Sequence, residues 1–200
     1  MADKTAKITV EQIKKLKELS GVGLTDAKKA LVEAKGDFDK ALEAMRKKGL
    51  TKAEKRGDRE TREGLIDAYI HDGRLGAIVE VNCETSFVAK TDEFKTLAHQ
   101  IAMQVASMNP LYVSEDDIPE SDRKAKMKEL EANFKGPDNM KEKILEGQMK
   151  KAFADKVLMN QPYILDDSKT VAEFIKEAIA KTGENITIRQ FKRIELGVTE

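Results

Sequence analysis

The chain contains one cysteine, no excess charge of either sign and no long apolar run. Cys83 alone cannot form an intrachain disulfide, and a single free thiol is typical of a protein from the reducing cytoplasm. The 36 lysines and arginines balance the 36 aspartates and glutamates, so no overall field attracts a polyanion such as nucleic acid. No stretch of roughly 18 apolar residues is present to span a membrane, and the N-terminus lacks the apolar segment of a secretory signal. We therefore expect a cytoplasmic protein that binds neither nucleic acid nor membranes directly.

The motifs that carry enzyme chemistry are also missing from the sequence. The two histidines, His71 and His99, have no cysteine or histidine neighbour at the spacing of metal ligands. No Gly-x-x-x-x-Gly-Lys-Ser/Thr segment is present to hold a nucleotide. The carboxylates are scattered over segments that are expected to face water. The sequence therefore predicts an interaction protein that is not an enzyme and that needs no cofactor.

Three short amphipathic segments open the chain and predict a three-helix domain over residues 1–50. Thr9 and Gln12 have the spacing of a capping box at the start of the first helix. Thr25 is expected to cap the second helix and Asp37 the third, which Gly49 should end. Such a domain is close to the lower size limit for an independent hydrophobic core.

The remainder of the chain predicts a charged linker and an α+β core. Residues 51–63 are mostly charged or small, with both signs interleaved, which indicates a solvated linker with helical character. Residues 64–200 are expected to form the core domain, with a small three-stranded antiparallel sheet. Its other elements are a helix over residues 91–107, a helical hairpin within residues 121–158, a turn at Gln161-Pro162-Tyr163 and a helix starting at Asp167 or Ser168.

The most informative segment is residues 80–90, Glu-Val-Asn-Cys-Glu-Thr-Ser-Phe-Val-Ala-Lys. It follows a strand-like alternation and places Phe87 among small and polar neighbours, where the strand should end. An exposed aromatic side chain at such a point can bind a pocket on another protein. Phenylalanine is more often buried, however, so residue type alone favours a core position for Phe87.

Two longer segments match a known family pattern. The first is Leu-Lys-Glu-Leu-Ser-Gly-Val-Gly-Leu-Thr-Asp-Ala-Lys-Lys-Ala-Leu over residues 16–31, and the second is Thr-Ser-Phe-Val-Ala-Lys over residues 85–90. Through these segments the chain resembles the bacterial elongation factor Ts family over nearly its whole length. The family pattern usually has aspartate where this chain has Ser86. Shorter matches occur at residues 146–149, 161–163, 167–171, 183–186 and 193–197.

The resemblance implies a guanine nucleotide exchange factor for the GTPase elongation factor Tu. In the family, an N-terminal domain similar to the ubiquitin-associated (UBA) fold docks on the GTPase, and the motif aromatic, here Phe87, inserts beside its Mg²⁺ and phosphate site. Short members are expected to work as homodimers, which would be noncovalent in this chain. The contacts that the resemblance implies are Leu24, Lys28, Thr85, Ser86, Phe87, Val88, Gln104 and Ile186.

Other interpretations remain open from the residues alone. Leu24 can belong to the core of the helical domain, and Lys28 can be an ordinary solvated charge. The Gly21-Val22-Gly23-Leu24 turn resembles the binding loop of UBA domains, which would indicate a ubiquitin-binding or peptide-binding adaptor. An enzyme that uses His71 or His99 is a third possibility. Release of GDP from elongation factor Tu, with and without the chain, distinguishes all three.

Overall fold

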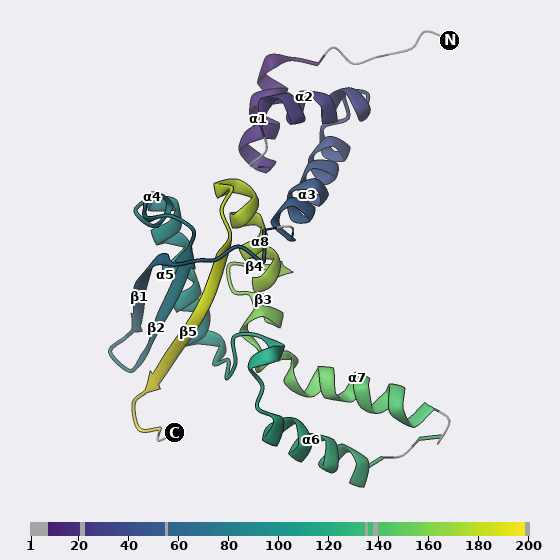
Figure 1. Cartoon of the computed structure of the whole chain (residues 1–200), viewed down its shortest axis with the longest axis vertical. Helices are drawn as coiled ribbons and strands as arrows, with labels where there is room; N and C mark the ends of the chain where they lie inside the picture. The colour runs from purple at the N-terminus through teal and green to yellow at the C-terminus, as the bar shows by residue number, and fades with distance from the viewer. Residues whose placement is uncertain (1–7, 21–22, 55, 135, 138–139, 199–200) are drawn as a thin grey trace. The chain divides into compact units, whose positions relative to one another are not determined.

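The structure is a computed structural model that describes residues 8–20, 23–54, 56–134, 136–137 and 140–198. It combines helices with a small three-stranded antiparallel sheet (Figure 1), so the predicted α+β class is confirmed. Two compact units alternate along the sequence, and the domain boundaries expected at residues 50 and 63 stay a prediction. The first unit is Met1–Leu65, Asn82–Phe94 and Glu173–Thr187, and the second is Ile66–Val81, Lys95–Ala172 and Ile188–Glu200.

The N-terminal helices are α1 (Val10–Ser20), α2 (Leu24–Glu33) and α3 (Phe38–Glu54). The capping box is present, because the Gln12 N–H donates to Thr9 Oγ1 at 3.2 Å and the Thr9 N–H donates to Gln12 Oε1 at 3.0 Å. The Lys40 N–H donates to Asp37 Oδ1 at 3.1 Å, as the predicted cap of α3 requires. These helices enclose a small core of Leu16, Ala27, Ala30, Leu31, Ala41 and Met45.

Two predicted helix ends in this region are wrong. Gly23 is the N-cap of α2, so Thr25 lies inside the helix, and Gly21 and Val22 of the expected turn are outside the described residues. Helix α3 continues through Gly49 to Glu54. A glycine inside a helix costs only about 1 kcal/mol, and the residues around this one are mostly good helix formers. The helical character predicted for the linker is therefore confirmed for residues 51–54.

The predicted three-stranded sheet consists of β1 (Glu63–His71), β2 (Leu75–Cys83) and β5 (Ile186–Glu195), in the order β1-β2-β5. The turn between β1 and β2 is closed by the Arg74 N–H, which donates to the His71 carbonyl at 3.0 Å. Asp72 (φ +49°) and Gly73 (φ +67°) between them have the positive φ angles of a type I′ hairpin turn. The sequence therefore indicates both the two strands of this hairpin and the turn between them.

One face of the sheet is covered by α5 (Asp92–Met108), which Thr91 caps by accepting the Phe94 N–H at 3.2 Å. His99 on α5 lies 3.3 Å from the Asp67 carboxylate on β1, and Arg193 on β5 donates to the Ala106 carbonyl at 3.0 Å. The odd-numbered side chains of β2 from 77 to 83 are buried, as the alternating pattern predicted.

The region after α5 contains the predicted helical hairpin and a second sheet that the sequence did not reveal. The hairpin consists of α6 (Glu120–Ala132) and α7 (Lys141–Ala154), and it is flanked by the 3₁₀ helices η1 (Glu115–Asp117) and η3 (Leu158–Asn160). Strand β3 (Pro162–Tyr163), at the expected turn, pairs with β4 (Asp166–Thr170) in an antiparallel two-stranded sheet.

Helix α8 (Val171–Thr182) therefore starts later than predicted. The Asp166 carboxylate accepts hydrogen bonds from the Ser168 hydroxyl at 2.6 Å and from the Ser168 N–H at 3.3 Å. These bonds, together with that of the nearby Lys169 ammonium, lower the pKa of the Asp166 carboxyl. Aspartate and serine form the same local bonds in turns as at helix starts, which explains the error.

Candidate partner-binding site

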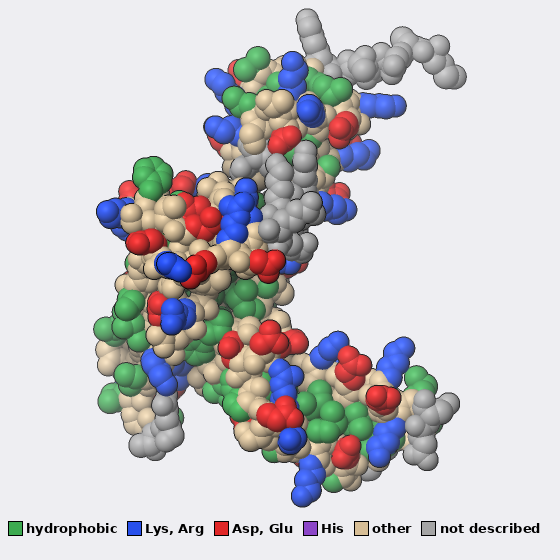
Figure 2. Space-filling model, viewed as in Figure 1, with side chains coloured by type: hydrophobic (Ala, Val, Ile, Leu, Met, Phe, Trp, Pro, Cys, Tyr) green, Lys and Arg blue, Asp and Glu red, His purple; other side chains and the backbone are tan. Residues whose placement is uncertain are grey.

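Phe87 lies on α4 (Ser86–Ala89), a single helical turn that follows β2. Its side chain is 79% exposed, whereas the next two residues, Val88 and Ala89, are buried. Figure 2 shows an apolar side chain protruding from the surface at α4. The core position favoured by residue type is therefore wrong for Phe87. The buried residues of this turn anchor it to the core, and the exposed Phe87 side chain can therefore contact a partner.

The start of α4 is fixed by Thr85. Its hydroxyl oxygen accepts the Val88 N–H at 3.4 Å, and its carbonyl accepts the Ala89 N–H at 3.2 Å. The Cys83 thiol also donates to that carbonyl at 3.2 Å. Burial raises the pKa of the Cys83 thiol, and the nearby charge of Glu184 raises it further. The thiol therefore keeps its proton and acts as a donor that holds the turn.

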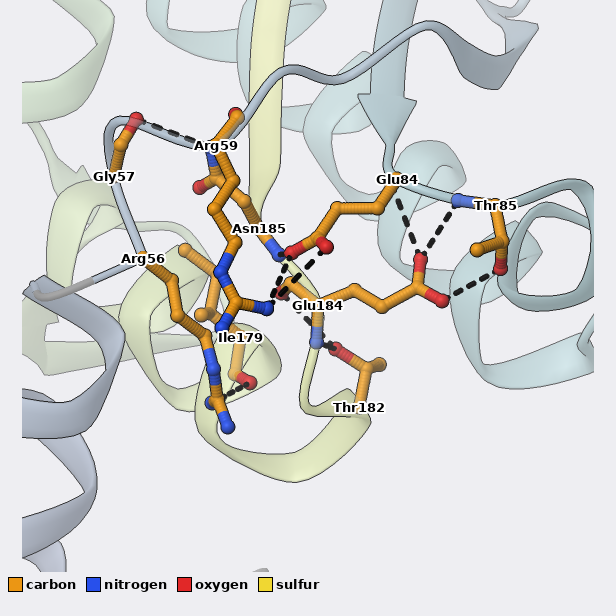
Figure 3. A network of polar contacts seen from close by, with 9 residues as sticks. All are labelled: Arg56, Gly57, Arg59, Glu84, Thr85, Ile179, Thr182, Glu184 and Asn185. Atoms are coloured by element: carbon orange, nitrogen blue, oxygen red, sulfur yellow. Dashed lines mark hydrogen bonds and ion pairs between the residues drawn. The ribbon is translucent and has the colours of Figure 1, made fainter.

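A polar network connects the segment before α4 with the turn before β5 (Figure 3). The Glu184 carboxylate accepts hydrogen bonds from the N–H groups of Glu84 (3.1 Å) and Thr85 (3.0 Å), and from the Thr85 hydroxyl (2.6 Å). In return, the Glu84 carboxylate accepts the Asn185 N–H at 2.6 Å. Arg59 lies 3.4 Å from the same Glu84 carboxylate. In the sequence, Glu184 and Asn185 stand only within a short match to the family pattern, and no local signal indicates this role.

Ser86 is the first residue of α4 and is exposed. The N–H groups in the first turn of a helix favour a negative charge. A serine hydroxyl supplies a hydrogen-bonding group there without that charge. The position beside Phe87 therefore lacks the electrostatic contribution that the aspartate of the family pattern would bring.

The residues expected to contact a partner from the N-terminal domain lie on one face of α2. Leu24 and Lys28 are four positions apart and both are exposed. Leu24 is 51% exposed, so it is not a core residue of the helical domain. Val32 was not among the expected contacts, although it is 56% exposed and continues the same face. Its spacing of four from Lys28 could have identified it.

Three of the expected contacts are buried, namely Val88 beside Phe87, Gln104 and Ile186. Gln104 is 0% exposed and Ile186 is 3% exposed. The Gln104 amide nitrogen donates to Gln161 Oε1 and to the Pro162 carbonyl, both at 3.1 Å, and its oxygen accepts the Ile164 N–H at 2.8 Å. The contacts expected at Gln104 and Ile186 stay predictions, and we leave both residues out of the proposed interface because their side chains are buried in the free chain.

The described residues contain no helix that is both long enough and apolar enough to cross a membrane. In the same residues, no three His, Cys, Asp or Glu side chains are grouped so that they can hold a metal ion. An exposed apolar side chain, as on α4, or an exposed helix face, as on α2, can bind a pocket on another macromolecule.

Comparison with known proteins places the chain in a family. A family model described as "Elongation factor TS" matches residues 1–198. Elongation factor Ts of Thermotoga maritima is 50% identical over 192 residues, which are 95% of this chain and 96% of that protein. The proteins of the same name from Thermoanaerobacter pseudethanolicus (47% over 194 residues; 95% of each chain) and Rippkaea orientalis (49% over 198 residues; 96% of this chain and 79% of that one) are similarly close. The chain therefore belongs to the elongation factor Ts family.

Proposed function

We propose that the chain is a guanine nucleotide exchange factor that binds elongation factor Tu and accelerates its release of GDP, without performing a chemical reaction of its own. Membership of the family supports the partner, and the 79% exposure of Phe87 on α4 carries the mechanism. Because translation takes place in the cytoplasm, we infer that the chain acts there. The test is release of labelled GDP from elongation factor Tu, which the chain should accelerate and an unrelated protein should not.

The mechanism is a thermodynamic linkage between two binding events. A factor that binds the nucleotide-free GTPase more tightly than the GDP-bound form must weaken GDP binding by the same factor. Phe87 supplies this difference in affinity if the pocket that receives it on the GTPase opens only when the GTPase groups that hold Mg²⁺ and phosphate move. Burying a phenylalanine side chain contributes about 1.5–3 kcal/mol, which offsets part of the cost of moving those groups.

The rest of the binding energy must come from a wider interface. We infer that the three-helix domain, acting as a UBA-like module, docks on the GTPase through the α2 face of Leu24, Lys28 and Val32. Two linked contacts raise the effective concentration of each other on the same partner. The α2 face therefore strengthens the complex, while Phe87 provides the discrimination against bound GDP.

Replacing Ser86 by aspartate is expected to tighten the complex with elongation factor Tu. The carboxylate is favoured in the first turn of α4, and an ionised hydrogen-bond acceptor is stronger than a hydroxyl. We expect isothermal titration calorimetry to give a severalfold lower Kd for the Ser86→Asp protein than for the unmodified chain. The matched control is Ser107→Asp, which places the same charge at an exposed position in the last turn of α5. A weaker complex for Ser86→Asp would contradict this role of the position.

We further infer that the chain forms a noncovalent homodimer through the face of the sheet that α5 leaves open. Ile66 and Ile70 on β1, Ile78 on β2 and Ile194 on β5 are between 46% and 76% exposed. The Leu196 N–H donates to the Arg74 carbonyl at 2.8 Å, and Gln190 donates to Glu80 at 2.7 Å, so even-numbered residues of β2 and β5 share one face. An apolar face of this kind suits a twofold contact with a second copy.

Light scattering tests the dimer. We expect a mass twice that of one chain, and we expect Ile194→Lys to halve it, because a twofold contact places two buried lysines in one interface. Val32→Lys, at an exposed position of the N-terminal domain, should leave the mass unchanged. A mass of one chain for the unmodified protein would exclude the dimer.

A further inference from the structure

A single turn of helix cannot by itself fix the direction of Phe87. Helix α4 has four residues, and the first turn of a helix is unfavourable because it orders several dihedral angles for one hydrogen bond. The direction of Phe87 must therefore depend on the contacts that hold the residues at the start of α4.

Glu184 supplies most of those contacts with one carboxylate. Its Oε2 atom accepts the backbone N–H groups of Glu84 at 3.1 Å and of Thr85 at 3.0 Å. Its Oε1 atom accepts the Thr85 hydroxyl proton at 2.6 Å (Figure 3). A carboxylate that accepts three hydrogen bonds from two successive residues fixes both their backbone and a side chain.

The Thr85 hydroxyl passes this constraint on to α4. A hydroxyl has one proton to donate and two lone pairs to accept with. Because the proton is directed to Glu184, the oxygen presents a lone pair to the Val88 N–H, which lies 3.4 Å away. Glu184 therefore sets the orientation of the cap on which the helical turn depends.

Glu184 is itself held in place. Its N–H donates to Thr182 Oγ1 at 3.3 Å, within a turn where Gly183 has a φ of +81°. The next residue, Asn185, donates its side-chain amide to the carbonyls of Gly57 (3.1 Å) and Arg59 (2.7 Å). The carboxylate therefore projects from a backbone that is bonded on both sides.

We propose that Glu184 is the positioning residue of Phe87, and that its carboxylate holds α4 so that the aromatic side chain is already oriented for the partner. A side chain that is ordered before binding loses less entropy when it enters a pocket. The exchange part of this inference rests on the proposed function, whereas the positioning part concerns the free protein.

The positioning part can be measured without the partner. The chain has no tryptophan, so Phe87→Trp introduces a single fluorescent reporter at the tip of α4. We expect Glu184→Ala to lower the fluorescence anisotropy of this reporter. The control is Glu93→Ala, which removes a carboxylate whose ion-pair partner is Lys181, at 3.0 Å, and not Thr85 or a residue of α4. Thr85→Val, which removes only the hydroxyl, should act in the same direction as Glu184→Ala, and Thr85→Ser should not.

The exchange part needs a double-mutant cycle. In the otherwise unmodified protein, we expect Glu184→Ala to reduce stimulated GDP release about tenfold, because only part of the effect of its three hydrogen bonds, equivalent to about one bond to a charged group, should reach Phe87. In the Phe87→Ala background, the same substitution should change release less than about twofold, because two residues that act through one contact are not additive. A purely structural defect would lower release by the same factor in both backgrounds.

The possible results separate the two ideas. Unchanged anisotropy in both Glu184→Ala and Thr85→Val would overturn the positioning role, whatever the exchange assay shows. Lower anisotropy, with no acceleration of GDP release from elongation factor Tu by the unmodified chain, would support the positioning role and reject the proposed function. Additive losses in the cycle would show that Glu184 acts on exchange by a route other than Phe87, and would overturn the inference.

Discussion

Replacing Phe87 by alanine is expected to slow the GDP release that the chain stimulates by about one to two orders of magnitude. The substitution removes the apolar surface that distinguishes the nucleotide-free GTPase from its GDP-bound form. Because the side chain is 79% exposed in the free protein, the free energy of unfolding should change by no more than about 0.5 kcal/mol. A large functional loss at constant stability is the signature of a contact residue.

The measurement is the release rate of fluorescent GDP from elongation factor Tu at a fixed concentration of each variant, with a thermal melt of each. Leu111→Ala is the matched control, because Leu111 is also an exposed apolar residue, at 55%, but lies outside the proposed interface. Phe87→Leu, which retains part of the apolar surface, should fall between the two. Equal release by the Phe87→Ala and Leu111→Ala proteins would remove Phe87 from the mechanism.

Local patterns predicted the elements that depend on local interactions. The Thr9 and Gln12 capping box, the Asp37 cap and the hairpin turn at Asp72 and Gly73 each rest on bonds or dihedral angles within a few residues. The alternation along β2 was equally readable, because one face of that strand is buried. Such features can be predicted from a short segment, because they do not depend on residues far away in the chain.

Features that depend on residues far apart in the chain were not predictable. The bonds between Glu184 and Thr85 join residues 99 positions apart. No pattern in either segment indicates that the two segments lie close together. The exposure of Phe87 was only weakly indicated, because residue type favours burial and the small and polar neighbours of Phe87 at the strand end did not outweigh it without the family pattern. Strand β3 was not predicted, because it has only two residues and its partner strand β4 consists of polar residues that resemble a helix start.

Gln104 illustrates the opposite case, in which the resemblance implied a contact and the structure shows a buried side-chain network. Gln104 on α5 bonds to Gln161 and to the backbone of Pro162 and Ile164. Gln161 in turn donates to the carbonyls of Met108 (3.2 Å) and Asp155 (2.7 Å). The two amides therefore attach the end of α5 to the segment around β3, and they satisfy partly buried backbone groups.

Replacing Gln104 by alanine is therefore expected to lower the free energy of unfolding by about 3 kcal/mol or more. The substitution leaves the buried Gln161 amide oxygen and two partly buried backbone groups, the Ile164 N–H and the Pro162 carbonyl, without their side-chain partner. An unsatisfied buried group costs about 1–3 kcal/mol in addition to the cavity. Urea unfolding measures the change, and Gln148→Ala on the exposed surface of α7 is the control, with an expected change within about 0.5 kcal/mol. A Gln104→Ala protein as stable as this control, but with weaker binding to elongation factor Tu, would restore Gln104 to the interface. The expected result instead assigns Gln104 to the scaffold and leaves the binding contacts to the exposed residues of α4 and α2.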